Sequence, residues 1–365
     1  MLRKFLSLML VLMLTAVPVL AETVSPIDAA DQLRADAQYA EALELLLPLA
    51  DEDPSEVVIS RIADCYVQTD DTANALIWLE RGAELDSEFC LYWLGDLYSD
   101  MDSDLYDIET AVRWYEKGVL AGDEYSMRDL AKLYISDDYG VTDYKKAETL
   151  LTMIVALEAF DEDSAARIDD GVAARAYELL GNLYSYSAYG MMNADKAVAC
   201  YEKAFPVRVN AANRLGHIYS CDEHGMVNLL TALSWYEQSA ALNDADGLIG
   251  LADLYSYESY KITNLPLAVS YYEQAAEQNN AKALRRLGDL YSYEGYNMVD
   301  VEKAVSYYEQ AAGLDDSEAL FRLGGIYTYE PFGVVDTEKA KTYYEQAANL
   351  GHENAAAELA RLQAE

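Results

Sequence analysis

Apolar residues recur along the chain in two phrases with helical spacing. The first phrase has the form L-[GA]-x-[LI]-Y, as at residues 287–291, and the second has the form A-x-x-[WY]-Y-E, as at residues 304–309. In each phrase the apolar positions fall three or four residues apart, which places them on one face of a helix. No run of residues alternates with a period of two, so the pattern predicts no strands. The chain is therefore expected to be all-α, with helices that alternate in type.

The phrases repeat with a fixed period, mostly of 36 residues. We call the last residue of the first phrase the phrase tyrosine; it stands at Tyr98, Tyr134, Tyr184, Tyr219, Tyr255, Tyr291 and Tyr327, with a weaker copy at Tyr66. One interval is 50 residues long, and the second phrase skips by the same amount at the same place. Repetition of this kind predicts a solenoid, interrupted by an insert of about 14 residues within 158–172.

Capping residues mark both ends of the second helix of each unit. Its predicted N-caps, whose side chains accept hydrogen bonds from free backbone N–H groups, are Asp71, Asp107, Asp143, Asn193, Asn228, Asn264, Asp300 and Asp336. Its predicted exits, which favour the left-handed conformation, are Asp86, Gly122, Asn243, Asn279, Asp315 and Gly351. Each unit thus reads as helix A, an eight-residue loop, a capped helix B and a short turn. Gly or Ala three residues before the phrase tyrosine is expected to let helix B approach helix A closely.

The two ends of the chain extend the series. Tyr39, the triplet at 41–43 and the Asp-Pro at 53–54 resemble a tetratricopeptide repeat, which brings the expected total to about nine helix pairs. The segment 353–363 reads as a lone helix A that caps the stack, as solenoids require. The expected organisation is a signal peptide at 1–21, a tetratricopeptide-like pair at 22–55, repeats at 56–158, an acidic insert at 159–172, repeats at 173–352 and a capping helix at 353–365.

The combined pattern resembles the Sel1-like repeat, a relative of the tetratricopeptide repeat. The clearest copy carries it at Leu287, Gly288, Tyr291, Asp300, Lys303, Ala304, Tyr307, Tyr308, Glu309, Ala311 and Ala312. The resemblance covers most of the chain and implies a right-handed αα-superhelix that acts as a scaffold or adaptor for other proteins. Exported bacterial members are often regulators or assembly factors at the cell envelope, so a protein partner at the envelope is the function implied.

Two departures from the family pattern change what is expected locally. Family loops usually carry Gly three and five residues past the phrase tyrosine, whereas here a Gly stands one step later, at Gly140, Gly190, Gly225 and Gly333, so the loop should turn differently. Cysteine-rich members staple each helix pair with a disulfide. Here Cys65, Cys90, Cys200 and Cys221 fall out of helical register, and we expect four buried free thiols.

The first 21 residues predict export. Arg3 and Lys4 precede a long apolar run that ends in a small-residue signature at Ala21, which is typical of a cleaved secretory signal. Its removal takes the formal net charge from −38 to −40. Such a charge disfavours nucleic acid as a partner, and no second apolar segment suggests membrane insertion after cleavage. The dispersed acidic residues are expected mainly to keep an exported monomer in solution, although divalent cations or a basic partner stay open.

The loops after helix A carry two further series of tyrosines. Tyr186, Tyr257, Tyr293 and Tyr329 lie two residues past the phrase tyrosine, and Tyr139, Tyr189, Tyr260 and Tyr296 lie five past it. The phrase tyrosines themselves are expected in the core, because they lie on the apolar helix face. The loop rings either pack on the neighbouring loop or form an exposed aromatic ridge that suits a protein interface or stacks on sugar rings.

Arginine recurs at one position of helix A, five residues before the phrase tyrosine. Arg214, Arg286 and Arg322 occupy it, with Arg61 in the weaker copy. Each Arg is expected to pair with a helix B glutamate such as Glu237, Glu309 or Glu345; the alternative is a free basic stripe that could grip a carboxylate.

Catalytic and cofactor motifs are missing from the sequence. It contains no phosphate-binding glycine loop, HExxH, CxxC or Gly-x-Ser-x-Gly, and the carboxylate-rich insert fails the spacing of a calcium loop. His224 takes the place of a loop tyrosine, so a structural role is expected for it rather than metal ligation. We therefore expect no catalytic, cofactor or metal residue and a scaffold that binds another protein. The alternative function is glycan binding by the loop tyrosines.

Overall fold

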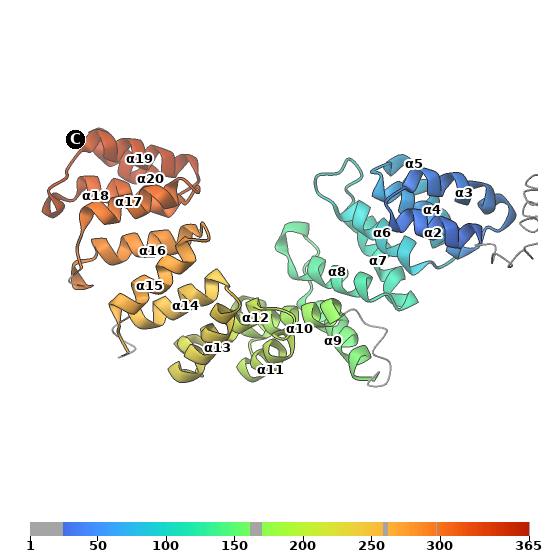
Figure 1. Cartoon of the computed structure of the whole chain (residues 1–365), viewed down its shortest axis with the longest axis horizontal. Helices are drawn as coiled ribbons and strands as arrows, with labels where there is room; N and C mark the ends of the chain where they lie inside the picture. The colour runs from blue at the N-terminus through green and yellow to red at the C-terminus, as the bar shows by residue number, and fades with distance from the viewer. Residues whose placement is uncertain (1–24, 161–169, 258–261, 297, 365) are drawn as a thin grey trace, which may run out of the picture. The chain divides into compact units, whose positions relative to one another are not determined.

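The structure is a computed structural model that describes residues 25–160, 170–257, 262–296 and 298–364. The predicted signal peptide, most of the insert and Tyr260 lie outside the described residues. Within these ranges every regular element is a helix, so the prediction of an all-α chain is confirmed (Figure 1). No described helix combines the length and the apolar content needed to cross a bilayer.

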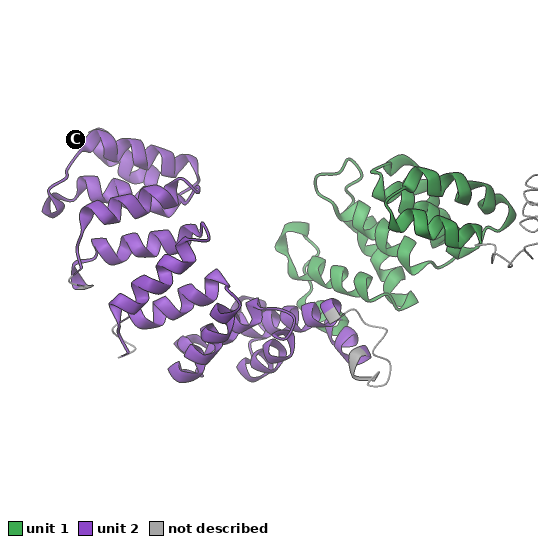
Figure 2. Cartoon of the chain, in the orientation of Figure 1, with its two compact units in different colours: residues 1–150 green, residues 151–365 purple. Residues whose placement is uncertain are grey.

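The helices group into two compact units, residues 1–150 and 151–365, which Figure 2 colours green and purple. Unit 1 contains α2 (Pro26–Ala35), α3 (Tyr39–Glu52), α4 (Glu56–Gln68), α5 (Thr72–Ala83), α6 (Glu88–Ser99), α7 (Ile108–Ala121), α8 (Glu124–Ile135) and the start of α9 (Tyr144–Phe160). Unit 2 contains the rest of α9, α10 (Asp170–Ser185), α11 (Ala194–Ala204), α12 (Asn210–Ser220), α13 (Leu229–Ala241), α14 (Ala245–Ser256), α15 (Leu265–Ala276), α16 (Ala281–Ser292), α17 (Val301–Ala312), α18 (Ser317–Thr328), α19 (Thr337–Asn349) and α20 (Ala355–Ala364).

Even-numbered helices are of type A and odd-numbered helices of type B. The described residues therefore hold nine A–B pairs followed by the lone α20, as the repeat count predicts. The helices that flank the insert, α9 and α10, have 17 and 16 residues, against 12 in each of α14 to α17. Among the residues that the structure describes, short 3-10 helices follow five type A helices: η1 (Asp137–Tyr139), η2 (Ser187–Tyr189), η3 (Asp222–His224), η5 (Glu294–Tyr296) and η6 (Glu330–Phe332).

The predicted caps form at both ends of helix B. All eight N-cap side chains accept a hydrogen bond from the backbone N–H three residues on; the Lys303 N–H, for example, donates to Asp300 Oδ1 at 3.1 Å. All six predicted exits have positive φ, from +55° at Asp86 to +99° at Gly122. A second set of caps, which the two phrases do not reveal, begins helix A at Asp123, Asp244, Asn280 and Asp316.

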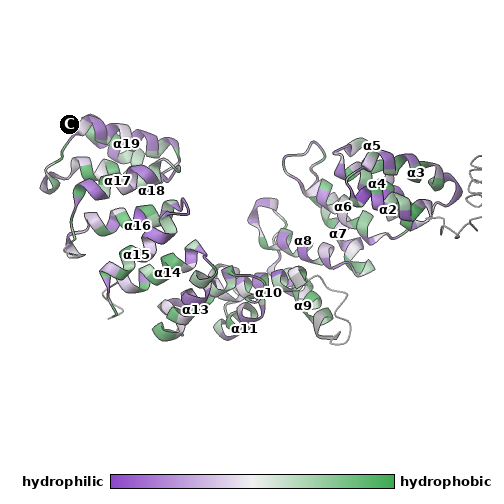
Figure 3. Cartoon of the chain, viewed as in Figure 1, coloured by the Kyte–Doolittle hydropathy of each residue, from purple (hydrophilic) through white to green (hydrophobic). Residues whose placement is uncertain are grey.

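Each helix pair buries its apolar faces against itself and the next helix. One core cluster joins Leu284 of α16, Tyr308 of α17 and Leu323 of α18, and similar clusters recur along both units. Figure 3 shows hydrophobic and hydrophilic residues mixed along the helices, which is the amphipathic pattern that such packing needs. Nearest-neighbour packing of this kind is how a solenoid holds its surface in place.

In six of the nine helix pairs, the most buried tyrosine is the one at the Y of the helix B phrase A-x-x-[WY]-Y-E. These residues, at most 8% exposed, are Tyr115, Tyr201, Tyr236, Tyr272, Tyr308 and Tyr344. Five of these rings, all but that of Tyr272, fill the space that a glycine leaves on helix A: a Cβ added to Gly288 would lie 2.6 Å from Cε1 of Tyr308. The small residue lets helix B approach helix A closely, as predicted, and the tyrosine ring of helix B packs directly against it.

The placement of the phrase tyrosines in the core is only partly correct. Tyr134, Tyr184 and Tyr327 are buried. The other four with clear copies are half-buried: Tyr98, Tyr219, Tyr255 and Tyr291. They lie at the edge of the apolar face of helix A, because the contact between the helix A glycine and the buried helix B tyrosine, which we call the Gly–Tyr contact, occupies the centre of that face. At this edge, Tyr291 stacks on Tyr307 of helix B with ring centroids 5.9 Å apart and ring planes 11° apart.

Candidate functional site

A groove of about 650 Å³ lies on the type A helices α14, α16 and α18 of unit 2. Tyr257, Tyr293 and Tyr329 line it, each as the residue that directly follows its helix, and Arg286 and Arg322 line it from within α16 and α18. The three tyrosines share almost the same backbone conformation, with φ between −89° and −83° and ψ between 104° and 118°. The repeat therefore places one ring at the same point of each successive unit.

The rings of this series are accessible to solvent. Tyr257 is 37% exposed, Tyr329 is 44% exposed and Tyr293, in the middle, is 60% exposed; Tyr186, earlier in unit 2, is 37% exposed. Single exposed apolar residues are common, but several of them along one groove are typical of an interaction site. Of the two possibilities raised by the sequence, the exposed ridge describes this series.

The series five residues past the phrase tyrosine behaves differently. Tyr139 and Tyr189 are half-buried. Tyr189 packs edge-on against Tyr186, with ring centroids 5.9 Å apart, and Phe332 packs in the same way against Tyr329 at 4.7 Å. The second ring thus supports the first within the same loop. Tyr260 lies outside the described residues, as does the side chain of Tyr296.

The arginines of the groove are paired, but the predicted partners are wrong. Arg286 Nε lies 3.5 Å from Asp253 Oδ1 of α14, one repeat earlier. Arg322 Nε lies 2.9 Å from Glu318 Oε1 on its own helix and 3.9 Å from Asp289 Oδ1 of α16. The residue five positions before the phrase tyrosine faces the preceding helix A rather than helix B. The arginine side chain therefore lies close to a carboxylate of the neighbouring repeat.

Glu309, one of the helix B glutamates that we expected to hold the arginines, instead accepts a hydrogen bond from the Tyr343 hydroxyl at 3.0 Å. One repeat earlier, Glu273 accepts a hydrogen bond from the Tyr307 hydroxyl at 3.4 Å in the same way. Burial and the Glu309 carboxylate together raise the pKa of Tyr343 to about 12. These bonds join helix B of one repeat to helix B of the next.

The floor of the groove is polar and its hydrogen bonds are made internally. The Tyr308 hydroxyl donates to Asp289 Oδ1 at 2.7 Å and lies 3.1 Å from Ser292 Oγ, and the Tyr272 hydroxyl donates to Asp253. Burial, followed by the nearby carboxylate, raises the pKa of both tyrosines, so the hydroxyls stay protonated at neutral pH. This role of the hydroxyl was not predicted from the sequence, although the signal was present: in the copies named above, the last aromatic of the helix B phrase is always Tyr, never Trp or Phe.

The charges of the groove are balanced rather than basic. Burial opposes the charge of Arg286 but Asp253 and other nearby groups outweigh it, so the net pKa shift is upward and the guanidinium remains charged. Two guanidinium groups thus face the carboxylates of Asp253, Asp289 and Glu318. A free basic stripe for gripping a carboxylate is therefore not what the structure holds.

The structure brings together five of the eleven residues proposed from the sequence, namely Tyr257, Tyr293, Tyr329, Arg286 and Arg322. Arg214 contacts Tyr186 earlier in unit 2, where its guanidinium donates to the hydroxyl and lies 5.7 Å from the ring centroid. Tyr139 belongs to unit 1, in η1. The groove residues offer aromatic surface, hydroxyl groups and fixed ion pairs, which suit binding more than proton transfer.

Comparisons with known proteins place this architecture in a family. The sequence matches the Sel1 repeat in seven segments: 66–87, 89–123, 174–205, 209–244, 245–280, 281–316 and 317–352. A search of curated proteins found no match. Among solved structures, the chain is similar to a Sel1 repeat protein from Oxalobacter formigenes, with a TM-score of 0.66, 20% identity and coverage of 95% of this chain and 98% of that one.

A second similar structure is c5321, a protective antigen present in uropathogenic Escherichia coli strains. Its TM-score is 0.59 and its identity 25%, over 87% of this chain and 66% of that one, so the match spans slightly less than two thirds of that protein's length. The fold and the repeated helix pairs thus define an α-solenoid of stacked repeats. The chain belongs to the Sel1 repeat family, whose members are generally protein-interaction scaffolds and typically non-catalytic.

Proposed function

We propose that this chain is an exported, non-catalytic scaffold that binds an extended segment of another polypeptide in the groove of α14, α16 and α18. The observation that carries the proposal is the convergence of three exposed tyrosines and two arginines on one groove of about 650 Å³. Family membership supports binding of a protein partner, and the predicted signal at 1–21 supports export.

The physics of the groove favours apolar side chains on the partner. Tyrosine supplies a large rigid ring with a polar tip, and residues of this type are frequent among those that dominate binding energy at interfaces. The rings recur once per repeat, so an extended chain can present successive side chains to Tyr257, Tyr293 and Tyr329 in turn. The hydroxyls and charged groups of the groove can then meet the polar backbone of the partner.

The charge of the chain favours a partner segment that is neutral or basic. The formal net charge is −38, and the groove has no positive excess to offset it. Opposite charge on the partner would speed association, and salt would slow it.

A differential capture experiment tests the proposal. The purified chain and a Tyr293→Ala, Tyr329→Ala double variant are immobilised and exposed to extract of the native host at micromolar concentration. A partner captured by the wild type should be lost or weakened at least about 30-fold in the variant, since a central tyrosine contributes ~2 kcal/mol or more. Tyr106→Ala is the matched control, because Tyr106 is 39% exposed in a loop of unit 1. Equal capture by the double variant and wild type would refute the assignment of the groove.

Glycan binding is the second candidate, and the exposed row of rings favours it, because tyrosine also stacks on sugars. The two functions separate in a titration followed by intrinsic fluorescence. A neutral cell-wall polysaccharide would bind with an affinity that is independent of salt, whereas a basic peptide would bind more weakly as salt rises. Fluorescence that stays unchanged across a panel of polysaccharides would exclude the glycan function.

A further inference from the structure

One repeat of unit 2 carries three metal-ligating side chains at positions that other repeats fill differently. His217, Cys221 and His224 stand two residues before, two after and five after the phrase tyrosine Tyr219. The corresponding residues one repeat earlier are Asn182, Tyr186 and Tyr189, and two repeats later they are Asp289, Tyr293 and Tyr296. This one repeat takes two of the three histidines and one of the four cysteines in the chain.

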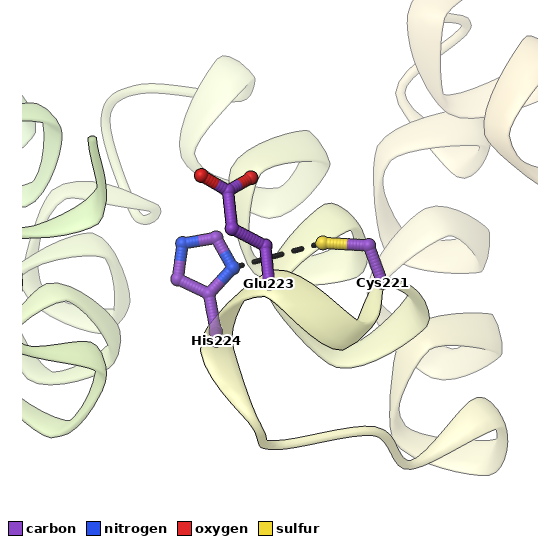
Figure 4. Close-up of side chains that lie close together, drawn as sticks. All are labelled: Cys221, Glu223 and His224. Carbon is purple, nitrogen blue, oxygen red and sulfur yellow. Dashed lines mark hydrogen bonds between the residues drawn. The ribbon is translucent and has the colours of Figure 1, made fainter. Parts of the chain in front are cut away.

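The structure gathers these side chains around one thiol. Cys221 Sγ lies 3.8 Å from His217 Nδ1 and 3.7 Å from His224 Nδ1. The candidate donor atoms of Cys221, Glu223 and His224 all lie within 4.8 Å of one another. Figure 4 shows these three side chains on one turn, with the His224 ring facing the Cys221 sulfur. Cys221 is half-buried rather than buried as expected from the sequence, and the same holds for Cys200.

A backbone carbonyl fixes the tautomer of His224. Its Nε2 lies 2.9 Å from the Ser185 carbonyl oxygen, which can only accept, so Nε2 carries the hydrogen. In the neutral ring the lone pair is then on Nδ1, the atom that faces the thiol. A ligating histidine is commonly held in this way by a carbonyl on its other nitrogen.

The distances from the thiol to the imidazoles are also compatible with two ligands on one metal ion. Zinc bound to a thiolate at about 2.3 Å and to imidazole at about 2.0 Å, in tetrahedral geometry, separates the two donor atoms by roughly 3.5 Å. Both Sγ to Nδ1 distances, 3.7 and 3.8 Å, are close to that separation. Cys221, Glu223 and His224 supply a thiolate, a carboxylate and an imidazole, three donors of types that Zn²⁺ accepts. His217 lies near the thiol but outside this group of three.

We propose that Cys221, Glu223 and His224 form a site for Zn²⁺ or a similar thiophilic divalent cation, whose fourth position is open to water. On binding, the Cys221 thiol loses its proton to solvent and the thiolate coordinates the ion. The bound ion joins the end of α12 to η3 and, through the Ser185 carbonyl, to the end of α10. This assignment replaces the expectation that His224 is only a structural substitute for a loop tyrosine, and it is independent of the proposed groove function.

The test uses the purified chain, stripped of metal with a chelator and titrated with Co²⁺ and then with Zn²⁺. One equivalent of Co²⁺ should give the near-ultraviolet absorption of a thiolate bound to cobalt, and Zn²⁺ should displace it. Cys221→Ser should abolish this absorption. Changing a mere neighbour of a ligand costs about 10- to 100-fold in affinity, so losing the thiolate should weaken Zn²⁺ binding by more than about 100-fold.

Two further variants keep the result interpretable. His224→Tyr restores the residue found at the equivalent Tyr189, so it should fold normally, as checked by circular dichroism, and still lose Zn²⁺ affinity. Cys200→Ser removes another half-buried thiol of the same unit and should bind Zn²⁺ like the wild type. Zn²⁺ should also raise the unfolding temperature of the wild type but not of Cys221→Ser. Wild-type chain that shows no thiolate absorption, or Zn²⁺ affinity that is unchanged in Cys221→Ser, would overturn the site.

Discussion

Replacing Gly288 by alanine tests how the helices of one repeat are held together. Glycine is normally a poor residue inside a helix, and alanine there stabilises by about 0.8–1 kcal/mol when nothing obstructs it. At Gly288, however, the new Cβ would lie 2.6 Å from Cε1 and 2.7 Å from Cδ1 of Tyr308. Distances that short are not tolerated, so either the ring or helix α17 must move.

The expected loss of stability follows from the contacts that the Tyr308 ring would lose. Tyr308 is only 1% exposed, and its hydroxyl bonds to Asp289 at 2.7 Å. An added methyl group in a well-packed core costs about 1–3 kcal/mol, and displacing the ring would also strain this buried hydrogen bond. After subtracting the gain in helix propensity, we expect a net destabilisation of about 1–2 kcal/mol.

Gly313→Ala is the matched control in the same repeat. Gly313 caps helix α17 with φ of −65°, and a Cβ there would meet only backbone carbonyls at 3.4 and 3.5 Å. This substitution should leave stability unchanged or increase it by up to about 1 kcal/mol, because it restricts the unfolded chain.

Urea unfolding followed by circular dichroism, with hydrogen exchange of the α16 and α17 amides, measures both variants. Because a solenoid can unfold in parts, the exchange data show whether the loss is confined to the repeats that contact Tyr308. The expected result is faster exchange in these helices for Gly288→Ala and unchanged or slower exchange for Gly313→Ala. If Gly288→Ala is as stable as Gly313→Ala, the reasoning about the Gly–Tyr contact is wrong.

Three other predictions concern caps, alkaline pH and thiols. Asp300→Ala removes a helix cap and should lower the free energy of unfolding by about 1 kcal/mol. Asp300→Asn copies the cap Asn264 of the preceding repeat and should leave the free energy of unfolding unchanged. The midpoints of urea unfolding measure both effects. Folding raises the pKa of Tyr343 from 10.0 to about 12, so the stability that this group contributes is complete below pH 10 and is lost as the pH rises through 12. Tyr343→Phe should therefore flatten the pH dependence of the unfolding temperature between pH 10 and 12. An unchanged slope would contradict this prediction. Burial raises the pKa of Cys65, Cys90 and Cys200 to about 11, leaving roughly one thiolate in a thousand at pH 8. Mass spectrometry should find these three thiols unmodified after brief iodoacetamide treatment of the folded chain and modified after unfolding.

Features that depend on local chemistry could be predicted from the sequence. Asp300 caps a helix because its side chain reaches a backbone N–H three residues away, and Asn279 ends one because its type tolerates positive φ. Neither property needs knowledge of the rest of the molecule. The number of helix pairs follows in the same way from the repeat period.

Features that depend on how helices are rotated against one another could not be predicted. Helical spacing puts Tyr291 and Tyr308 equally on apolar faces, and only the fit of one ring over Gly288 decides that Tyr308 is the buried one. The partner of Arg286 is Asp253 rather than a helix B glutamate because the angle between successive repeats brings those two groups together. The cluster at Cys221 could have been predicted from the sequence, because an alignment of the repeats shows His or Cys at three positions in this one repeat.

The most direct test of the proposed function is photo-crosslinking in the native host. A photoreactive phenylalanine analogue replaces Tyr293, the most exposed ring of the groove, and in a second strain it replaces Tyr106 in a loop of unit 1. The account predicts that the Tyr293 position crosslinks to one polypeptide, which mass spectrometry identifies by an extended segment, and that the Tyr106 position does not. Crosslinks from Tyr106 to the same partner, or none from Tyr293, would contradict binding in the groove.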